Sequence, residues 1–259
     1  APLLASLKGT SRPLPFVEDL AVPPERLAEF LPFAQRIFQR HEVTATLYAH
    51  AASGQIHFRP IMPVPTRGAD TSIEAIARDL YRRVRDFGGT ISGEHGDGLS
   101  RTAFIRTQYG SLYRVFQQLK DIFDPQRMMN PEKIISNDPS LTVKYLRHTK
   151  PLVSAAADPQ SARLLPVMQL AWTAEEATDA AVRCNGCGSC RVQVAPQRMC
   201  PFVTADGDEE LTPRAKANVV RNSLSTGRLQ ELMAEDGTSR LLDSCFNCKQ
   251  CELDCPSGV

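Results

Sequence analysis

The chain has 259 residues, of which 42% are hydrophobic, so it can bury the cores of two domains. Its 30 basic and 29 acidic residues leave a net charge of +1, which excludes the strong field expected of a nucleic-acid-binding or membrane-surface protein. No apolar run approaches the roughly 18 residues of a membrane-spanning helix, and no charged leader segment stands at the start. The chain begins without methionine and ends shortly after Cys255, which indicates a piece of a longer polypeptide.

The first elements are expected to be a strand and a helix. Pro15 to Val22 mixes apolar and acidic side chains, as an edge or first strand would. Pro23-Pro24 suits a helix entry, and apolar residues then keep helical spacing up to His41. Pro32 is expected to kink or restart this helix.

A β-hairpin follows, and it places two histidines. Val43 to His50 alternates as a strand, Ile56 to Ile61 is its expected return, and Ser53-Gly54 predicts a two-residue turn. With that turn His50 lies directly opposite His57. Their Cβ atoms would be about 5 Å apart, close enough for two imidazoles to chelate one divalent ion. The alternative is two unrelated histidines in a strand pair.

The rest of the first domain adds helices and one short strand. Residues 71–87 carry an apolar stripe at helical spacing, and Gly88-Gly89 ends that helix. Thr90 to Ser92 is expected to be a strand, and residues 112–123 form another amphipathic helix. This order predicts an α+β fold with an antiparallel sheet for residues 1–135.

A glycine-rich loop, Gly93 to Gly98, offers further polar groups. Its glycines let the backbone bend so that Glu94 and His95 can converge with the two histidines of the hairpin, which a regular strand would forbid. A His-His-Glu set leaves coordination positions open, as catalytic metal sites do.

The second half of the chain has a different character. Residues 136–163 are polar, contain proline and lack periodicity, so they are expected to form a linker. Residues 164–259 carry helical patterns and cysteine-bearing loops with no strand signal, which predicts an all-α domain. Within it, Thr212-Pro213 is a good start for a helix to about Leu229. That helix would connect two groups of cysteines.

All eight cysteines lie in the last part of the chain, in two groups of the same design. Each group reads C-x2-C-x2-C followed by a fourth cysteine with proline directly after it, which is the run that holds a [4Fe–4S] cluster. Three closely spaced thiolates can wrap three corners of a cubane while the remote cysteine closes the fourth. The chain is therefore expected to bind two [4Fe–4S] clusters through Cys184, Cys187, Cys190, Cys200, Cys245, Cys248, Cys251 and Cys255.

The partner of each fourth cysteine is a separate question. In two-cluster ferredoxins the fourth cysteine of one run ligates the other cluster, which would give Cys255 to the first group and Cys200 to the second. Structural zinc is the alternative, but it has no use for a third cysteine repeated in both groups. Disulfides are disfavoured because closely spaced triplets without a secretory segment point to metal and a reducing compartment.

Three segments carry a resemblance to a known family. Tyr48 to His57, Gly93 to Gly98 and Asn130-Pro131-Glu132-Lys133 resemble the C-terminal substrate (cap) domain of flavin-linked D-2-hydroxy-acid dehydrogenases. With the ferredoxin-like tail, nearly the whole chain looks like the central part of bacterial fusion dehydrogenases, such as the D-2-hydroxyglutarate type. One departure is that Ala52-Ser53-Gly54-Gln55 stands where the family usually has Gly-Asp-Gly-Asn.

The resemblance implies roles for individual residues. His50, His57 and Glu94 match the family's ligands of a divalent metal, zinc or manganese, and His95 matches its catalytic base. The same likeness makes Arg59 a substrate-facing catalytic residue and Asn130 a cofactor-binding one. FAD would be bound mainly by an N-terminal domain that this sequence lacks.

The implied function is oxidation of a D-2-hydroxy acid such as D-2-hydroxyglutarate, D-lactate or glycolate. Hydride would leave for flavin, and two [4Fe–4S] clusters would pass the electrons to a downstream acceptor, a quinone or a redox protein. Such an enzyme is expected in the cytoplasm or peripherally at the inner membrane face, with no nucleic-acid partner. The competing interpretation is an iron–sulfur electron-transfer module with no catalytic activity of its own, and a third is a zinc-ribbon interaction protein.

Overall fold

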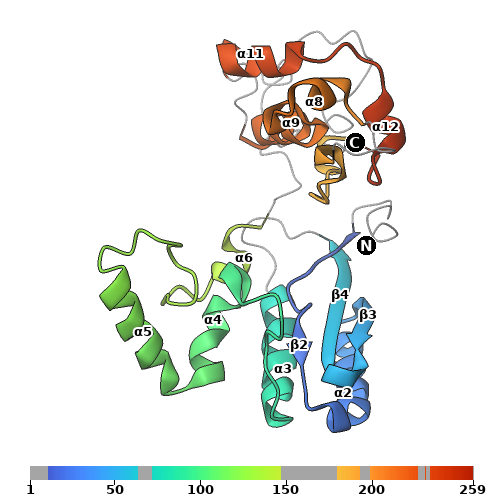
Figure 1. The fold of residues 1–259 in the computed structure, drawn as a ribbon. Helices are drawn as coiled ribbons and strands as arrows, with labels where there is room; N and C mark the ends of the chain where they lie inside the picture. The colour runs from blue at the N-terminus through green and yellow to red at the C-terminus, as the bar shows by residue number, and fades with distance from the viewer. Residues whose placement is uncertain are drawn as a thin grey trace, which may run out of the picture. The chain divides into compact units, whose positions relative to one another are not determined.

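The chain folds into two compact units in the computed structural model, which describes residues 11–63, 72–146, 180–192, 199–226, 231 and 234–258 (Figure 1). The first, here called the sheet unit, spans Thr10–Arg147. The second, here called the cysteine unit, comprises the described residues from 180 onward. The two units are described separately.

The sheet unit is built on one long strand, β4 (Gln55–Pro63). It pairs antiparallel with β3 (Thr44–His50) along most of its length, and with β1 (Ser11–Pro13) and β2 (Leu20–Ala21) at its two ends. The antiparallel sheet confirms the expected α+β class. The first strand is shorter than expected. Within residues 15–22, only Leu20–Ala21 pair with β4.

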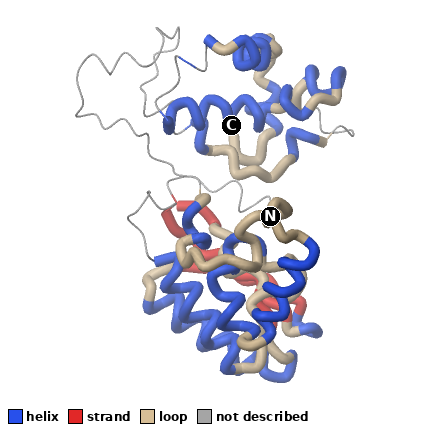
Figure 2. The backbone as a smooth tube through the Cα atoms, turned by 90° about the vertical axis from the view of Figure 1, so that its left-hand side faces the viewer, coloured by secondary structure: helices blue, strands red, loops and turns tan. Residues whose placement is uncertain are grey.

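Two helices form the core with the inner face of the sheet (Figure 2). They are α2 (Leu27–Arg40), which follows the short 3-10 turn η1 (Pro24–Arg26), and α3 (Ser72–Asp86). The expected stripes are buried: Phe30, Ala34, Ile37 and Phe38 on α2, and Ile73, Ile76, Ala77, Leu80, Tyr81 and Val84 on α3. Pro32 does not restart α2, which continues through this exposed proline as one helix.

Alternation along β4 separates this core from the opposite face of the sheet. Ile56, Phe58 and Met62 point into the core. Because successive side chains of a strand point to opposite faces, His57 and Arg59 lie on the other face. The helices therefore pack on one face and leave the histidine face free for a site.

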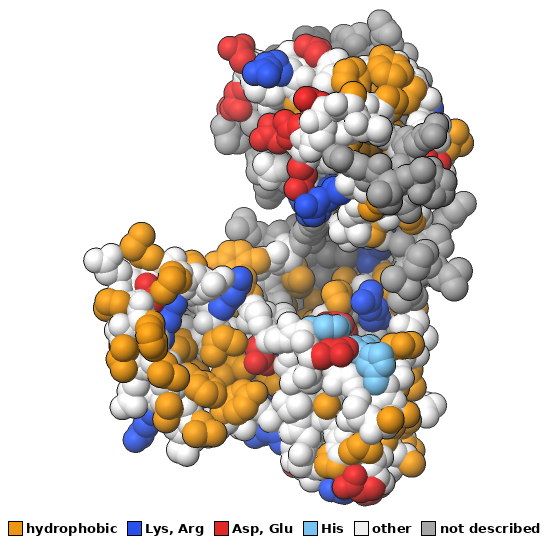
Figure 3. Space-filling view, in the orientation of Figure 1, with side chains coloured by type: hydrophobic (Ala, Val, Ile, Leu, Met, Phe, Trp, Pro, Cys, Tyr) orange, Lys and Arg blue, Asp and Glu red, His pale blue; other side chains and the backbone are white. Residues whose placement is uncertain are grey.

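Helices α4 (Gly98–Tyr109), α5 (Leu112–Phe123) and α6 (Leu141–Lys144) complete the unit. The sequence did not predict α4, because Ile105 is the one large apolar residue it buries and no stripe results. Helix α5 has its expected bounds, but most of its apolar stripe is exposed, as the orange surface over α5 in Figure 3 shows.

Two other expectations change within this unit. Thr90 to Ser92 forms no strand but one bridge, Ala21 to Thr90. Helix α6 lies in the stretch expected to be a linker, and its Leu141 and Thr142 are buried, so residues 136–146 belong to the sheet unit. The rest of the expected linker lies outside the described residues.

The cysteine unit is helical throughout its described part, as expected. Its elements are η4 (Ser189–Arg191), α8 (Pro201–Asp206), η5 (Glu209–Leu211), α9 (Pro213–Thr226), α11 (Asp236–Asp243) and α12 (Gln250–Asp254). Helix α9 begins as predicted, because the buried Thr212 hydroxyl accepts a hydrogen bond from the Ala215 amide at 3.1 Å. In neither unit does a described helix have the length and hydrophobicity needed to span a bilayer.

Candidate metal centre and cysteine clusters

The hairpin places its two histidines on one face, in a register that differs from the predicted one. His50 pairs with Gln55 and Tyr48 pairs with His57, so the predicted two-residue turn is wrong. Residues Ala51–Ser53 form a 3-10 turn, and Gly54 closes it at φ 70°. His50 and His57 are diagonal neighbours on the same face, and their ring centroids are 5.3 Å apart.

Glu94 brings three imidazoles together. Its Oε1 lies 3.1 Å from His57 Nε2, 3.5 Å from His95 Nε2 and 3.7 Å from His50 Nε2. The side chains of His50, Glu94 and His95 are about half exposed, whereas that of His57 is 10% exposed. The four residues singled out in the sequence thus meet at one open place on the sheet unit, the pale blue and red surface in Figure 3.

Glu18, which the sequence analysis did not single out, holds two of these imidazoles. Its backbone carbonyl accepts a hydrogen bond from His57 Nδ1 at 2.6 Å, and its carboxylate accepts one from His95 Nδ1 at 2.9 Å. Both Nδ1 atoms must carry hydrogen, because neither oxygen can donate when Glu18 is ionised. The Nε2 atoms of His57 and His95 both face Glu94 Oε1, and in the neutral form of each ring Nε2 is the atom that carries the lone pair.

Asp19 fixes the loop that carries Glu94 and His95. It is fully buried and accepts four hydrogen bonds at distances of 2.5 to 3.1 Å. The donors are the backbone N–H groups of Glu94 and His95, the Ser92 hydroxyl and the side-chain amide of Gln55. Burial by itself raises the pKa of Asp19, but these hydrogen bonds outweigh burial and hold the pKa below its usual value.

Gln55 is the last residue of Ala52-Ser53-Gly54-Gln55, the segment that departs from the motif of the family that the sequence resembles. Gly93 faces it closely, since a Cβ on Gly93 would lie 1.8 Å from Gln55 Oε1. A side chain at position 93 would therefore displace Gln55 from its hydrogen bond with Asp19. Gln55 thus links the hairpin to Asp19 and to the start of the glycine loop.

The donor atoms suit a divalent cation. Asp19, His57, Glu94 and His95 each offer a ligand atom, and these atoms lie within 4.8 Å of one another. Asp19 is a poor candidate among them, because its oxygens already accept four hydrogen bonds. His50 is not in this set, although its Nε2 lies 3.7 Å from Glu94 Oε1. Glu94 and His57, with either His50 or His95, offer the nitrogen and oxygen atoms that zinc accepts with positions to spare.

The other two residues named from the sequence lie elsewhere or at the margin. Arg59 is two residues beyond His57 on the same strand face, opposite Thr46. Asn130 lies after α5, where its side-chain oxygen accepts a hydrogen bond from Lys133 Nζ at 3.0 Å. It lines an open groove with Phe116 and Ile134, and none of the site histidines borders that groove.

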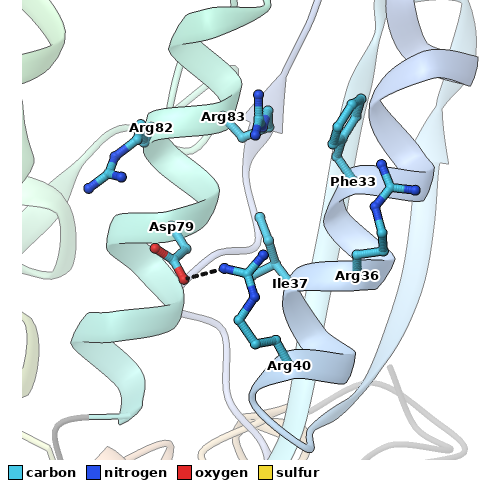
Figure 4. A pocket seen from close by; sticks show the side chains of 7 residues that line it. All are labelled: Phe33, Arg36, Ile37, Arg40, Asp79, Arg82 and Arg83. Atoms are coloured by element: carbon cyan, nitrogen blue, oxygen red, sulfur yellow. Dashed lines mark ion pairs between the residues drawn. The ribbon is translucent and has the colours of Figure 1, made fainter.

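A cavity between α2 and α3 is lined by four arginines and one aspartate (Figure 4). Its charges serve the packing of the two helices. Arg40 pairs with Asp79 at 3.5 Å, and the guanidinium groups of Arg36 and Arg83 lie over the Phe33 ring at 4.4 and 4.6 Å. None of the site histidines borders this cavity.

In the cysteine unit, the first triplet meets the last cysteine of the chain. Cys184, Cys187, Cys190 and Cys255 line one small apolar cavity, together with the start of α9. This is the crossed arrangement expected of a two-cluster ferredoxin. Burial raises the pKa of the Cys190 thiol, and the neighbouring Cys184 and Cys187 raise it further.

The second triplet faces the loop of the remaining cysteine. Cys200 directly precedes α8, and Phe202 packs on Phe246 with ring centroids 5.4 Å apart, which brings the loop of Cys200 to that of Cys245 and Cys248. Burial also raises the pKa of the Cys251 thiol. None of the eight cysteines forms a disulfide.

Comparison with known families matches both units. The model for FAD linked oxidases, C-terminal domain, matches residues 1–134, and the model for a 4Fe-4S dicluster domain matches residues 180–259. The chain is 27% identical to a D-2-hydroxyglutarate dehydrogenase of Pseudomonas putida and 25% identical to one of Escherichia coli, in each case over 99% of this chain and 28% of the relative. A D-lactate dehydrogenase of Archaeoglobus fulgidus is 28% identical over 46% of this chain and 26% of its own length.

Proposed function

Because the chain belongs to the family of FAD-linked oxidase C-terminal domains and carries a 4Fe-4S dicluster domain, we propose that it is the substrate-handling and electron-transfer part of an enzyme that oxidises a D-2-hydroxy acid. One observation carries the proposal: three imidazoles and one carboxylate converge on an open face of the sheet unit. The relatives' names favour D-2-hydroxyglutarate or D-lactate as substrate. The chain spans 28% of the length of the two D-2-hydroxyglutarate dehydrogenases compared above, so the activity belongs to the larger protein.

His50, His57 and Glu94 are the proposed ligands of one zinc or manganese ion. A bound divalent ion would supply Lewis acidity and a template for the hydroxyl and carboxylate of the acid. The hydrogen bond from His57 Nδ1 to the Glu18 carbonyl supports this role, because it fixes the ring with Nε2 toward Glu94, as hydrogen-bond partners of metal-ligating histidines do. Arg59, on the same face, is placed to face a substrate carboxylate.

His95 is the proposed base. Its Nε2 takes the proton of the substrate hydroxyl as the carbon–hydrogen bond is oxidised. In the absence of a cation, its hydrogen bond to Glu18 raises the pKa of His95, which makes the imidazole a better proton acceptor. FAD, when bound, accepts the hydride, and Asn130 is a proposed contact of that cofactor. The eight cysteines would hold the two clusters that carry the electrons onward.

The test uses the complete flavoprotein. His95→Asn should slow flavin reduction by a D-2-hydroxy acid about 10²- to 10⁴-fold, with metal content and substrate binding nearly unchanged. Stopped-flow flavin bleaching and metal analysis on the same sample measure both. Loss of metal in this variant would make His95 a ligand, and an unchanged rate would remove it from the mechanism.

The metal site has its own test in the chain with its clusters loaded, where iron occupies the thiols. Titration with Mn²⁺ should show one site that the His50→Ala, His57→Ala double variant loses. His41→Ala is the matched control, since His41 pairs with Asp79 away from the site. Equal Mn²⁺ affinity in the double variant and the wild type would leave an electron-transfer module without this metal site.

A further inference from the structure

We propose that Glu18 is the positioning residue for His95: its carboxylate holds the imidazole as the Nδ1–H tautomer, so that Nε2 faces the site as a lone pair. The inference rests on the proposed function for what His95 does there. The geometry is direct, because Glu18 Oε1 lies 2.9 Å from His95 Nδ1. In the opposite tautomer Nδ1 would carry a lone pair against a carboxylate, and Nε2 could accept no proton.

Glu18 can hold His95 because Glu18 is itself held. Its side chain is 13% exposed, and that of Arg101 is 4% exposed. Arg101 Nη2 lies 3.5 Å from Glu18 Oε1, and Arg101 Nη1 donates to the Gly96 carbonyl at 2.7 Å. Arg101 thus joins the glycine loop to Glu18, and it lies in the first turns of α4, the helix that begins where the loop ends.

The charges along the contacts from Arg101 to Glu18 to His95 indicate that Glu18 positions the imidazole and does not merely pack in the sheet unit. An arginine buried in the sheet unit neutralises Glu18 on one side, and a half-exposed imidazole binds it on the other. A carboxylate placed between a fixed cation and an imidazole N–H is the arrangement that sets the tautomer of a catalytic histidine. A side chain that only filled space in the sheet unit would not place its carboxylate against a half-exposed imidazole.

The same residue contains an internal control. Glu18 holds His57 through its backbone carbonyl at 2.6 Å, and it holds His95 through its side chain. Replacing the side chain therefore removes the hydrogen bond to His95 and leaves that of the carbonyl to His57, from whose Nδ1 the carboxylate lies 3.9 Å away. Glu18→Leu is the sharpest variant, because leucine has a similar size and no acceptor, whereas the amide oxygen of glutamine could still accept from Nδ1 while Arg101 donates to it.

The experiment reads the tautomers in the whole chain labelled with ¹⁵N-histidine, by two-bond ¹H–¹⁵N correlation at a pH where the imidazoles are neutral. The chain has five histidines, so loss of a signal in His95→Asn and in His57→Ala assigns the two rings. In the wild type, both His95 and His57 should show a protonated Nδ1. In Glu18→Leu, Nδ1 has lost its acceptor and Glu94 Oε1 lies 3.5 Å from Nε2, so the His95 proton should move to Nε2 while His57 keeps its pattern.

Glu29→Leu is the matched control, since Glu29 pairs with Arg26 on the surface at 3.2 Å, and it should change neither ring. A wild-type His95 protonated at Nε2, or a His95 pattern unchanged in Glu18→Leu, would overturn the proposal. The first of these outcomes needs no variant, so the proposal stays falsifiable if Glu18→Leu misfolds.

The complete flavoprotein supplies a second readout. Glu18→Leu should lower the rate of flavin reduction about 10²-fold, with substrate affinity within about twofold, because the base is present in the wrong tautomer. A shifted tautomer with an unchanged rate, in an enzyme that His95→Asn also leaves unchanged, would sink the role of His95 and keep that of Glu18. A large loss in His95→Asn with no effect of Glu18→Leu would do the reverse.

Discussion

At the residue scale, the site depends on an acidic pair that stands inside an apolar segment. Val17 and Leu20 are fully buried, and between them Glu18 and Asp19 turn to the histidine face and the glycine loop. Buried carboxylates persist only when they are paired and hydrogen-bonded. Two acidic residues inside an apolar run, Glu18-Asp19, were therefore the sequence pattern that could have indicated these two site residues. The spacing of the histidines could not reveal them.

Asp19 gives a stability prediction at this scale. Asp19→Ala should lower the free energy of unfolding of the sheet unit by about 3 kcal/mol, because it strands Arg101 and the groups that now donate to a buried carboxylate. Asp121→Ala is the control, since Asp121 pairs with Arg127 on the surface, and it should cost less than about 1 kcal/mol. Urea unfolding followed by circular dichroism measures both values.

Hydrogen exchange gives the local check on the same variant. The Glu94 and His95 amides donate to Asp19, so they should lose protection in Asp19→Ala and keep it in Asp121→Ala. Equal unfolding energies, or protected amides in both variants, would show that Asp19 does not hold the loop.

At the element scale, the turn that joins β3 to β4 decides where His50 lies. Gly54 and Gly88 both have left-handed φ angles, 70° and 75°, but their surroundings differ. A Cβ on Gly54 would lie 1.8 Å from the Val22 carbonyl oxygen, whereas a Cβ on Gly88 would meet nothing within 4 Å. A substitution at Gly88 would therefore meet only backbone strain, whereas one at Gly54 would meet both backbone strain and a clash with the Val22 carbonyl.

Alanine at each position tests this difference. Gly88→Ala should cost about 1 kcal/mol, the strain of a left-handed alanine. Gly54→Ala should cost about 3 kcal/mol, because overpacking against the Val22 carbonyl adds to that strain. It should also weaken Mn²⁺ binding by displacing His50, while Gly88→Ala should leave binding intact. Similar costs at both positions would mean that the turn relaxes freely.

The elements also show what a single sequence can reveal. Apolar stripes predicted α2, α3 and α5, because burial repeats at the helical period. An apolar stripe could not show that most of this face of α5 is exposed. Helix α4 has no such stripe, because it buries Arg101 and Thr102 beside Ile105, and the sequence therefore did not predict it. Alternation predicted the hairpin, but the register depended on a turn whose shape is set by contact with Val22, which no local pattern encodes.

At the scale of the whole molecule, the two kinds of site differ in how far their residues are separated. Six of the eight cysteines lie in two short runs, so spacing alone predicted the clusters. The histidine site draws on segments near residues 18, 50, 57, 94 and 101, and its supporting residues became visible only when the fold brought them together.

The crossed ligation of the clusters can be decided by combining variants. Replacing Cys245, Cys248 and Cys251 with serine should leave one [4Fe–4S] cluster. In that background Cys255→Ser should abolish the remaining cluster, whereas Cys200→Ser should leave it, because Cys255 lines the cavity of the first triplet. Iron and acid-labile sulfide are measured on protein kept without oxygen.

The converse outcome would assign each fourth cysteine to its own run. Stoichiometric zinc with almost no iron in the unaltered chain would contradict the cluster assignment altogether.

The exposure of the histidine face has a consequence for when the site can work. Charges 4 Å apart interact by about 1 kcal/mol in bulk water and by about 4 kcal/mol where the effective dielectric constant is near 20. With His50, Glu94 and His95 about half exposed, the sheet unit alone leaves these groups in the weaker regime. Any surface that covers this face therefore excludes water and lowers the effective dielectric constant there. It strengthens each charge interaction of the site without moving an atom.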